Sequence, residues 1–213
     1  MSKPRLFIGN RRFSSWSLRA WQVLRKSGLD FEEVLVPLDD VDTRSTISEI
    51  SPGGTVPALH TEDGVIWDSL AICEWAAEQV PSLWPASAPL RHRARSAASA
   101  MHAGFFALRQ HCPMDLGREP AAIELNDATR MDIALMQALW HDVATRPGPY
   151  LFGEWSIADA FFTPAATRFR TYAVDLHSEA QAYCDQLLAD EDFLAWEAGA
   201  LEEDFPNPYE NPI

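Results

Sequence analysis

The chain has 213 residues, 47% of them hydrophobic and 11% aromatic, which is enough to build a core in one large domain or two small ones. Its formal net charge of −14 opposes binding to nucleic acid and to anionic lipid, because like charges repel. No stretch reaches the ~20 apolar residues of a membrane span, and the N-terminus turns polar before a signal peptide forms. These features predict a cytoplasmic protein that binds neither nucleic acid nor membranes.

Cysteine and histidine give no pattern typical of redox or metal chemistry. The three cysteines, Cys73, Cys112 and Cys184, are widely spaced and form no CxxC pair. The six histidines form no HExxH motif and no cluster with cysteine. We therefore expect three buried, reduced thiols and no metal site.

The chain begins with the order strand, loop, helix. The apolar run 6–8 predicts a buried first strand, and the polar loop 11–17 follows it. Apolar residues from Leu18 onward fall mainly on one helical face, which predicts a helix with Ser17 as its N-cap and Gly28 as its C-terminal stop.

Further short elements complete the first part of the chain. The spacing of a strand–helix–strand unit predicts that the second strand is parallel to the first, and two later runs read as an antiparallel hairpin. The expected elements are a strand at 31–38, a short helix within 39–50, strands at 56–60 and 65–67, and a helix over 70–79 capped by Asp68 and Ser69.

Prolines separate this part from a helical remainder. Three prolines between residues 81 and 90 predict a linker between an N-terminal α/β domain at 1–80 and an all-helical domain at 91–213. The expected helices cover 91–110, 124–145, 156–172 and 179–188, with a last one through Trp196. The proline-rich tail 204–212 either packs as an extended strap or stays mobile.

The order of the first elements matches a thioredoxin-like domain, although other small α/β arrangements fit the same pattern. Val56-Pro57 follows a turn and opens a strand, where proline cannot donate to a central ladder. A cis peptide bond explains this placement, and a trans proline at a sheet edge is the alternative.

Four motifs carry a resemblance that covers essentially the whole chain. They are Ser-Ser-Trp-Ser-Leu-Arg at 14–19, Ser-Pro-Gly-Gly-Thr-Val-Pro-Ala-Leu at 51–59, Trp-Asp-Ser-Leu-Ala-Ile at 67–72, and Gly-Glu-Trp-Ser-Ile-Ala-Asp-Ala at 153–160. The chain resembles the cytosolic glutathione S-transferases, and among them the zeta-like bacterial members. The resemblance implies an N-terminal thioredoxin-like domain, a C-terminal helical-bundle domain and a homodimer.

The resemblance also implies a site for glutathione as co-substrate. The backbone of Val56, before cis-Pro57, would pair with the cysteinyl part of glutathione, and Asp68 would receive the γ-glutamyl ammonium. Ser69, at a helix N-terminus, would hold the γ-glutamyl carboxylate. The alternative for Asp68 and Ser69 is simple helix capping, which is compatible with ligand binding.

Ser14 lies where the family places its activating hydroxyl, so the resemblance implies that Ser14 favours the glutathione thiolate. Ser15 is a second possible donor, and which of the two is the main one stays open. Helix capping is the alternative for Ser15 and Ser17.

Two residues depart from the zeta pattern. Trp16 replaces the family's usual cysteine. Its indole either lines the second-substrate site or fills the domain interface. The arginine with which isomerase members grip a substrate carboxylate falls on Thr171, with Arg168 and Arg170 nearby on other helical faces. This argues against maleylacetoacetate isomerisation.

The family's second-substrate site lies between the activating loop and the first long helix of the second domain. Its candidates are Phe13, Trp16, His102, Phe105, Phe106, Arg109, Met114 and Phe169. The alternative for most of them is the core, because aromatic residues and methionines at helical spacing usually pack inside. Asp159 is expected to be a structural capping-box acid.

The sequence therefore predicts a glutathione transferase that attacks a small electrophilic, partly apolar substrate, as in detoxification. A binding or regulatory module of the same fold and a zeta-type isomerase are the alternatives. A glutaredoxin-like reductase is a third, but it needs a cysteine within residues 14–17, where none occurs.

Overall fold

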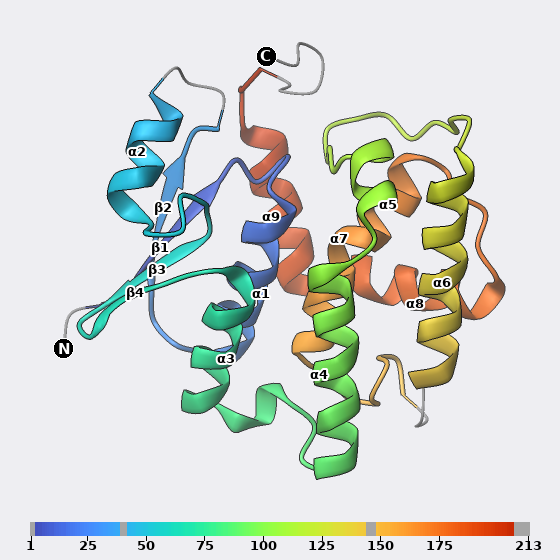
Figure 1. Cartoon of the computed structure of the whole chain (residues 1–213), viewed down its shortest axis with the longest axis horizontal. Helices are drawn as coiled ribbons and strands as arrows, with labels where there is room; N and C mark the ends of the chain where they lie inside the picture. Colours follow the sequence, from blue (N-terminus) through green and yellow to red (C-terminus); the bar gives the residue numbers. More distant parts are fainter. Residues whose placement is uncertain (1–2, 39–41, 144–147, 207–213) are drawn as a thin grey trace.

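The computed structural model describes residues 3–38, 42–143 and 148–206 (Figure 1). A four-stranded sheet with helices comes first, and the described chain after Gln79 is helical. This confirms the predicted thioredoxin-like domain followed by a helical domain, while the boundaries at 80 and 91 stay a prediction. In these ranges no helix is long and apolar enough to cross a membrane, and no group of three or more His, Cys, Asp or Glu side chains could hold a metal ion.

The sheet has the strand order β2-β1-β3-β4, with β1 parallel to β2 and antiparallel to β3, and β3 antiparallel to β4. Both the predicted parallel pair and the predicted hairpin are confirmed. The elements are β1 (Arg5–Gly9), α1 (Ser15–Ser27), β2 (Glu32–Val36), α2 (Thr43–Ile50), β3 (Ala58–Thr61), β4 (Gly64–Ile66) and α3 (Ser69–Gln79).

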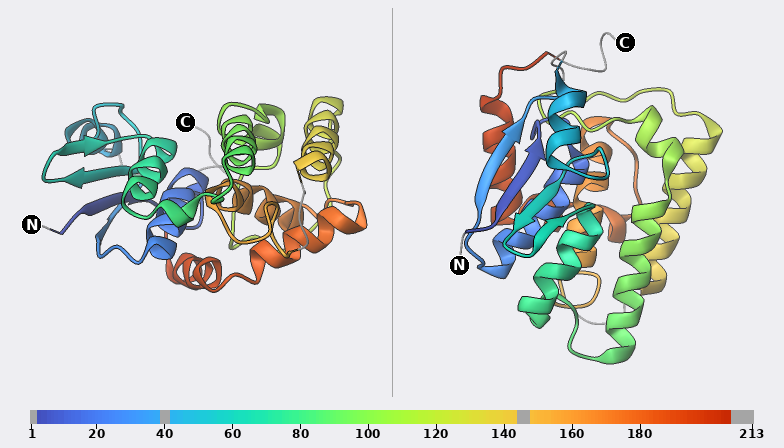
Figure 2. Two further views of the ribbon diagram at one scale, coloured as in Figure 1. Left: turned by 90° about the horizontal axis from the view of Figure 1, so that it is seen from below. Right: turned by 60° about the vertical axis from the view of Figure 1, so that its left-hand side comes forward.

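Both faces of the sheet are covered, and successive side chains of β1 point alternately into the two cores. Leu6 and Ile8 of β1 are fully buried in the main core, which includes α1 and α3. Phe7, between them, belongs to a smaller cluster with Val36 and Ile47 of α2 on the opposite face. Helix α2 therefore covers one face of the sheet, and α1 and α3 separate the other face from the helical domain (Figures 1 and 2).

The helical domain packs around α7. Its elements are the short 3-10 helix η1 (Pro81–Leu83), α4 (Ala88–Ala103), α5 (Phe106–His111), α6 (Asp127–Val143), α7 (Ile157–Thr171), α8 (Ser178–Leu188) and α9 (Glu191–Glu202). Helix α7 contacts α1 of the first domain as well as α4 and α8 (Figure 2). The prediction of one helix over 91–110 is wrong. Helix α4 ends at Ala103, with Gly104 as its C-cap, and Phe105 has a φ of 60°, which lies outside the range of a right-handed α-helix.

Three predictions reach residues that the structure does not describe. These are the start of the helix placed within 39–50, the end of the helix placed at 124–145 and the tail beyond residue 206.

The free cysteines Cys73, Cys112 and Cys184 are all buried, as predicted.

The predicted capping box of α7 is present. The Asp159 carboxylate is fully buried and accepts hydrogen bonds from the backbone N–H groups of Ser156 (2.8 Å) and Leu151 (3.3 Å) and from the Tyr183 hydroxyl (2.8 Å). Burial raises the pKa of Asp159 to about 6 despite these bonds. The acid therefore ties α7 to α8 and to the loop before it.

The first helix begins earlier than its apolar pattern indicated. Ser14, and not Ser17, is the N-cap, because the Ser14 Oγ accepts the Ser17 backbone N–H at 3.3 Å. The other end agrees with the prediction, since Gly28 closes α1 with a φ of 71°.

Candidate functional site

Three of the four sequence motifs meet where β1 ends. Ala58 pairs with Phe7 in antiparallel register, so Val56 and Pro57 lie beside the carboxyl end of β1. The Val56-Pro57 peptide bond is cis, as predicted. Strand β4 runs antiparallel to β3, so β4 finishes, and leads into α3, at the same end of the sheet. The N-termini of α1 and α3 are thus brought to one end of the sheet.

Ser14 is a buried hydroxyl within a small serine network. It is 6% exposed, and its Oγ donates to the Ser17 Oγ at 2.8 Å. The Ser17 Oγ also accepts the backbone N–H of Gly9, the last residue of β1, at 3.0 Å. The hydroxyl expected to act on a thiol is therefore fixed to the strand end, and it can donate to a new acceptor only by giving up its bond to the Ser17 Oγ.

Ser15 is held from the other domain. The buried Arg168 of α7 donates through Nη2 to the Ser15 Oγ at 3.2 Å, and through Nε and Nη1 to the carbonyls of Cys112 (2.9 Å) and Pro164 (2.8 Å). The Ser15 oxygen is an acceptor here, so its own proton points to another group. A neighbouring cation withdraws charge from this oxygen and makes the hydroxyl a better donor.

The N-terminus of α3 combines an acid and an unsatisfied hydroxyl. Asp68 caps the helix by accepting the Leu70 N–H at 2.9 Å, and the Trp67-Asp68 peptide bond is also cis. Ser69 is fully buried, and its Oγ has no hydrogen-bond partner among the described residues. A buried hydroxyl without a partner is costly, so this position calls for a ligand atom or water.

His102 of α4 connects the two helix N-termini. Its Nε2 lies 3.1 Å from the Asp68 Oδ2, and its ring meets the Trp16 indole edge-on at 5.3 Å. Both oxygens of Asp68 are therefore engaged, one in the helix cap and one with the helical domain. Trp16 lies at the domain interface, where it bridges α1 and α4.

The predicted second-substrate residues fall into two groups. Trp16, His102 and Arg109 lie together, since the Arg109 guanidinium stacks on the Trp16 ring at 4.8 Å. Of the others, Phe13, Phe105, Met114 and Phe169 are buried, whereas Phe106 is 65% exposed.

Position 171 gives no cation to this site. Thr171 is buried, and Arg170 forms an ion pair with Glu197 of α9. Arg168 is committed to the backbone carbonyls described above and to Ser15.

One feature that the sequence did not indicate is the attachment of the β1–α1 loop to the helical domain. The Glu203 carboxylate accepts the backbone N–H groups of Arg11 (2.9 Å) and Arg12 (3.3 Å), and the Trp196 indole donates to the Arg11 carbonyl at 3.0 Å. Arg12 in turn forms two hydrogen bonds with the Asp115 carboxylate, at 2.6 and 3.2 Å. The helical domain therefore holds the loop that precedes Ser14.

The second missed feature is Arg19, a fully buried residue of α1. Its guanidinium lies 4.5 Å from the Trp16 ring and 5.0 Å from the Phe161 ring. The residue belongs to the motif at 14–19, but nothing in the sequence indicated that its charge is buried.

Comparison with known proteins adds an independent line of argument. A family model described as "Glutathione S-transferase, N-terminal domain" matches residues 13–79. A maleylpyruvate isomerase from a Ralstonia species is 29% identical over 174 residues, which are 76% of this chain and 82% of that protein. A probable maleylacetoacetate isomerase from Caenorhabditis elegans is 27% identical over 178 residues, 82% of each chain.

Solved structures give the same fold. A holo structure of maleylpyruvate isomerase, described as a bacterial zeta-class glutathione S-transferase, matches with a TM-score of 0.72 and 25% identity over 94% of this chain and 99% of that one. A glutathione transferase homologue from Burkholderia, solved with bound glutathione, has a TM-score of 0.73 and 21% identity over 95% and 100%. The similarity therefore extends over both domains.

Proposed function

We propose that this chain, which belongs to the glutathione S-transferase family and is close to its zeta-like bacterial members, binds glutathione where β1, α1 and α3 meet and activates its thiol with Ser14. The unpartnered, buried Ser69 hydroxyl at the N-terminus of α3 carries this proposal. A carboxylate there would accept a hydrogen bond from Ser69 and gain from the positive end of the helix dipole.

Two further parts of glutathione, the cysteinyl unit and the γ-glutamyl ammonium, find partners nearby. The Val56 backbone, beside the cis-proline that precedes β3 at the end of the sheet, offers pairing groups for the cysteinyl unit. Asp68 offers its half-exposed carboxylate to the γ-glutamyl ammonium. Since His102 already contacts the same carboxylate, the ammonium either shares Asp68 with His102 or displaces it.

Thiol activation follows from the serine network. When a thiolate lies beside Ser14, the hydroxyl exchanges its neutral bond to Ser17 for a charge-assisted bond to sulfur, which is the stronger one. A thiol with a pKa of about 8.5 is mostly protonated at neutral pH, and lowering that pKa by about two units requires about 2.7 kcal/mol. One charge-assisted bond together with the N-terminus of α1 supplies energy of this order. Ser15, polarised by Arg168, is the second donor.

The proposed reaction is attack of the glutathione sulfur on an electrophilic carbon of a small, partly apolar substrate. The bond forms from the thiolate electron pair, and the substrate either releases a leaving group or takes up a proton.

A zeta-type isomerase, in which the sulfur adds reversibly and leaves again, is the second candidate. The named relatives from Ralstonia and Caenorhabditis elegans favour it. The absence of an arginine at position 171 argues against an identical grip on the substrate.

Calorimetric titration with glutathione tests the binding site. Wild type should bind, and Ser69→Ala and Asp68→Asn should each weaken binding by roughly tenfold, because each removes a polar contact worth about 1.4 kcal/mol. Ser96→Ala and Asp63→Asn remove an exposed hydroxyl and an exposed carboxylate elsewhere and should bind like wild type. No binding by wild type at millimolar glutathione would contradict the proposal.

Turnover separates an enzyme from a binding module of the same fold. An enzyme should conjugate glutathione to an activated aryl halide or an unsaturated carbonyl compound, and Ser14→Ala should slow this without much loss of glutathione affinity. Binding without turnover of any such electrophile would favour the binding or regulatory module. We also propose that the protein is cytoplasmic and forms a homodimer, and sedimentation of the purified protein tests the homodimer.

A further inference from the structure

A second cleft lies within the helical domain, away from the proposed glutathione site. It has a volume of about 920 Å³ and lies between α6, α8 and residues 148–151. Both helices lie on the side of the helical domain that faces away from the sheet (Figures 1 and 2). The described residues that line it include none of those proposed to hold glutathione. Clefts of roughly 300–1,000 Å³ hold small organic molecules, so this one is large enough for a ligand of its own.

The lining of the cleft is largely small, apolar and aromatic. Ala134 and Ala138, four positions apart, lie on one face of α6, and Ala182 lines the cleft from α8. Larger side chains at these positions would fill the space between the two helices. Trp140 and Tyr183 add aromatic surface. A flat aromatic molecule suits such a lining, because it packs well against the faces and edges of rings.

Trp140 borders the cleft with a donor that the protein leaves unused. Its side chain is 3% exposed, and its Nε1 has no hydrogen-bond partner in the part of the chain that the structure describes. The ring is fixed by edge-on contacts with Phe162, Phe169 and Tyr183, whose ring centroids lie 5.5, 6.0 and 4.9 Å away. An indole N–H only donates, and leaving it buried without an acceptor is costly. The cleft beside the ring is the space from which an acceptor can reach it.

The other polar groups of the cleft indicate what a ligand has to supply. The Tyr183 hydroxyl donates to Asp159 at 2.8 Å. The Tyr150 hydroxyl donates to Asp190 at 3.3 Å, so the protons of both tyrosines are used. Gln137 accepts a backbone N–H through its Oε1 at 2.8 Å, and its NH₂ group has no partner among the described residues. The unused groups are thus donors, on the indole and on Gln137, and the ligand has to supply acceptors.

The charge around the cleft favours an uncharged ligand. Its described lining contains neither lysine nor arginine, and the acid there, Glu179, is paired with His141 at 3.2 Å. The whole chain carries a formal net charge of −14. An anion would lose its hydration without gaining an opposite charge, and unused N–H donors do not attract a cation. A neutral oxygen acceptor meets the needs of the site without either cost.

We propose that this cleft is a second ligand site, which binds a neutral, planar aromatic molecule whose carbonyl oxygen accepts the Trp140 N–H. The ring system lies between α6 and α8, beside the alanines and the Tyr183 ring. Because the cleft is separate from the N-termini of α1 and α3, a molecule bound there does not meet the glutathione thiol. The protein therefore carries this ligand without changing it chemically, and the inference does not depend on glutathione binding.

Two probes that differ only by a carbonyl group test the inference. 9-Fluorenone and fluorene share one flat tricyclic skeleton, and equilibrium dialysis measures both affinities at micromolar ligand. Wild type should bind fluorenone roughly tenfold more tightly, as expected when a buried donor gains its acceptor. The anionic 9-oxofluorene-2-carboxylate should bind no more tightly than fluorenone. Trp140→Phe keeps a ring and removes the N–H, so the preference for fluorenone over fluorene should fall to about onefold.

A second variant locates the probe without disturbing the core. Ala182→Leu adds bulk at an exposed position inside the cleft and should weaken fluorenone binding at least roughly tenfold, because it narrows the space between the helices. Ala195→Leu makes the same change at an exposed position of α9 outside the cleft and should bind fluorenone as wild type does. In nitrogen-15 NMR spectra, fluorenone should move the indole N–H signal that is lost in Trp140→Phe downfield, and fluorene should not.

The outcomes separate this site from the proposed glutathione site. Loss of fluorenone binding in Ala182→Leu, with retention by wild type in saturating S-benzylglutathione, supports the second site. No binding of fluorenone by wild type, equal binding of fluorenone and fluorene, or binding that Ala182→Leu leaves unchanged overturns it. Tighter binding of the carboxylate overturns the assignment of a neutral ligand. Failure of wild type to bind glutathione would overturn the proposed function and leave this inference standing.

Discussion

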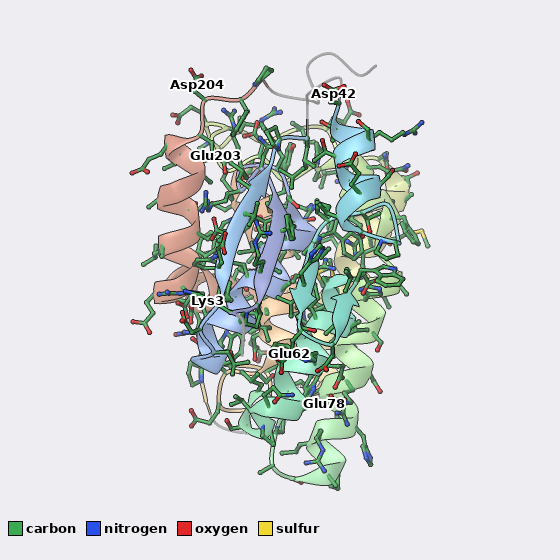
Figure 3. All side chains as sticks on the ribbon, turned by 90° about the vertical axis from the view of Figure 1, so that its left-hand side faces the viewer. Lys3, Asp42, Glu62, Glu78, Glu203 and Asp204 are labelled. Atoms are coloured by element: carbon green, nitrogen blue, oxygen red, sulfur yellow. The ribbon has the colours of Figure 1, made fainter. Side chains whose placement is uncertain are left out.

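The attachment of the β1–α1 loop to Glu203 links the end of α9 to the segment that leads into Ser14, the residue proposed to activate the thiol. Glu203 lies just beyond the last residue of α9, near the end of the sheet (Figure 3). Its side chain is 6% exposed and accepts three hydrogen bonds: from the N–H groups of Arg11 and Arg12, and from the Arg11 guanidinium at 3.5 Å. Glu203→Ala removes all three and leaves two backbone donors without a partner.

The magnitude follows from these contacts. A hydrogen bond to a charged group contributes about 1.5–3 kcal/mol, and the longest of the three contributes least. Because the loop is partly accessible to water, we expect Glu203→Ala to lower the free energy of unfolding by about 2–4 kcal/mol. Glu202→Ala removes the same charge from an exposed neighbour and should stay within about 0.5 kcal/mol of wild type.

Urea unfolding of both variants measures the difference, and the pKa of bound glutathione provides the functional readout. If the loop holds Ser14 in place, Glu203→Ala should also raise the thiol pKa of bound glutathione, whereas Glu202→Ala should not. Equal stability of the two variants would refute the reasoning.

Three further predictions concern the buried polar groups. Burial raises the pKa of Asp159 to about 6 from 3.8, so the folded state keeps a proton that the unfolded state has lost. Wild type should therefore gain stability relative to Asp159→Asn as the pH falls from 7 toward 4, by up to about 3 kcal/mol, and lose it as the pH rises through 6. Urea unfolding at several pH values checks this, and a difference that does not vary with pH would contradict it. Ser17→Ala leaves the Gly9 N–H without its acceptor and should cost about 1–3 kcal/mol in the same assay, with Ser45→Ala as an exposed control. Arg168→Met removes the donor to Ser15 and to two buried carbonyls, and should cost about 3 kcal/mol or more in thermal unfolding; an unchanged melting temperature would contradict this.

The local motifs of the sequence predicted much of this structure. The cis Val56-Pro57 bond, the Asp68 cap and the box between Ser156 and Asp159 depend on neighbouring residues, so their signals lie within a few positions. The N-cap of α1 was assigned wrongly because serines at 14, 15 and 17 are all competent caps, and the backbone selects one of them.

The features that sequence could not predict depend on distant partners. Glu203 and Arg11 are 192 residues apart, and Arg168 and Ser15 are 153 residues apart, so no local pattern joins them. The break at Phe105 was missed because alanine-rich sequence on one side continued the helical pattern past Gly104. No local pattern marked Arg19 as buried, and its neighbours include Phe161 of the helical domain, which lies 142 positions further along the chain.

The most direct test of serine activation is the ultraviolet absorbance of the glutathione thiolate, followed against pH in complexes with wild type and Ser14→Ala. In the wild-type complex we expect a thiol pKa about two units below the free value of about 8.5, and in Ser14→Ala a pKa close to the free value with glutathione still bound. A bound thiol that titrates like free glutathione in the wild-type protein would contradict thiolate activation at this site.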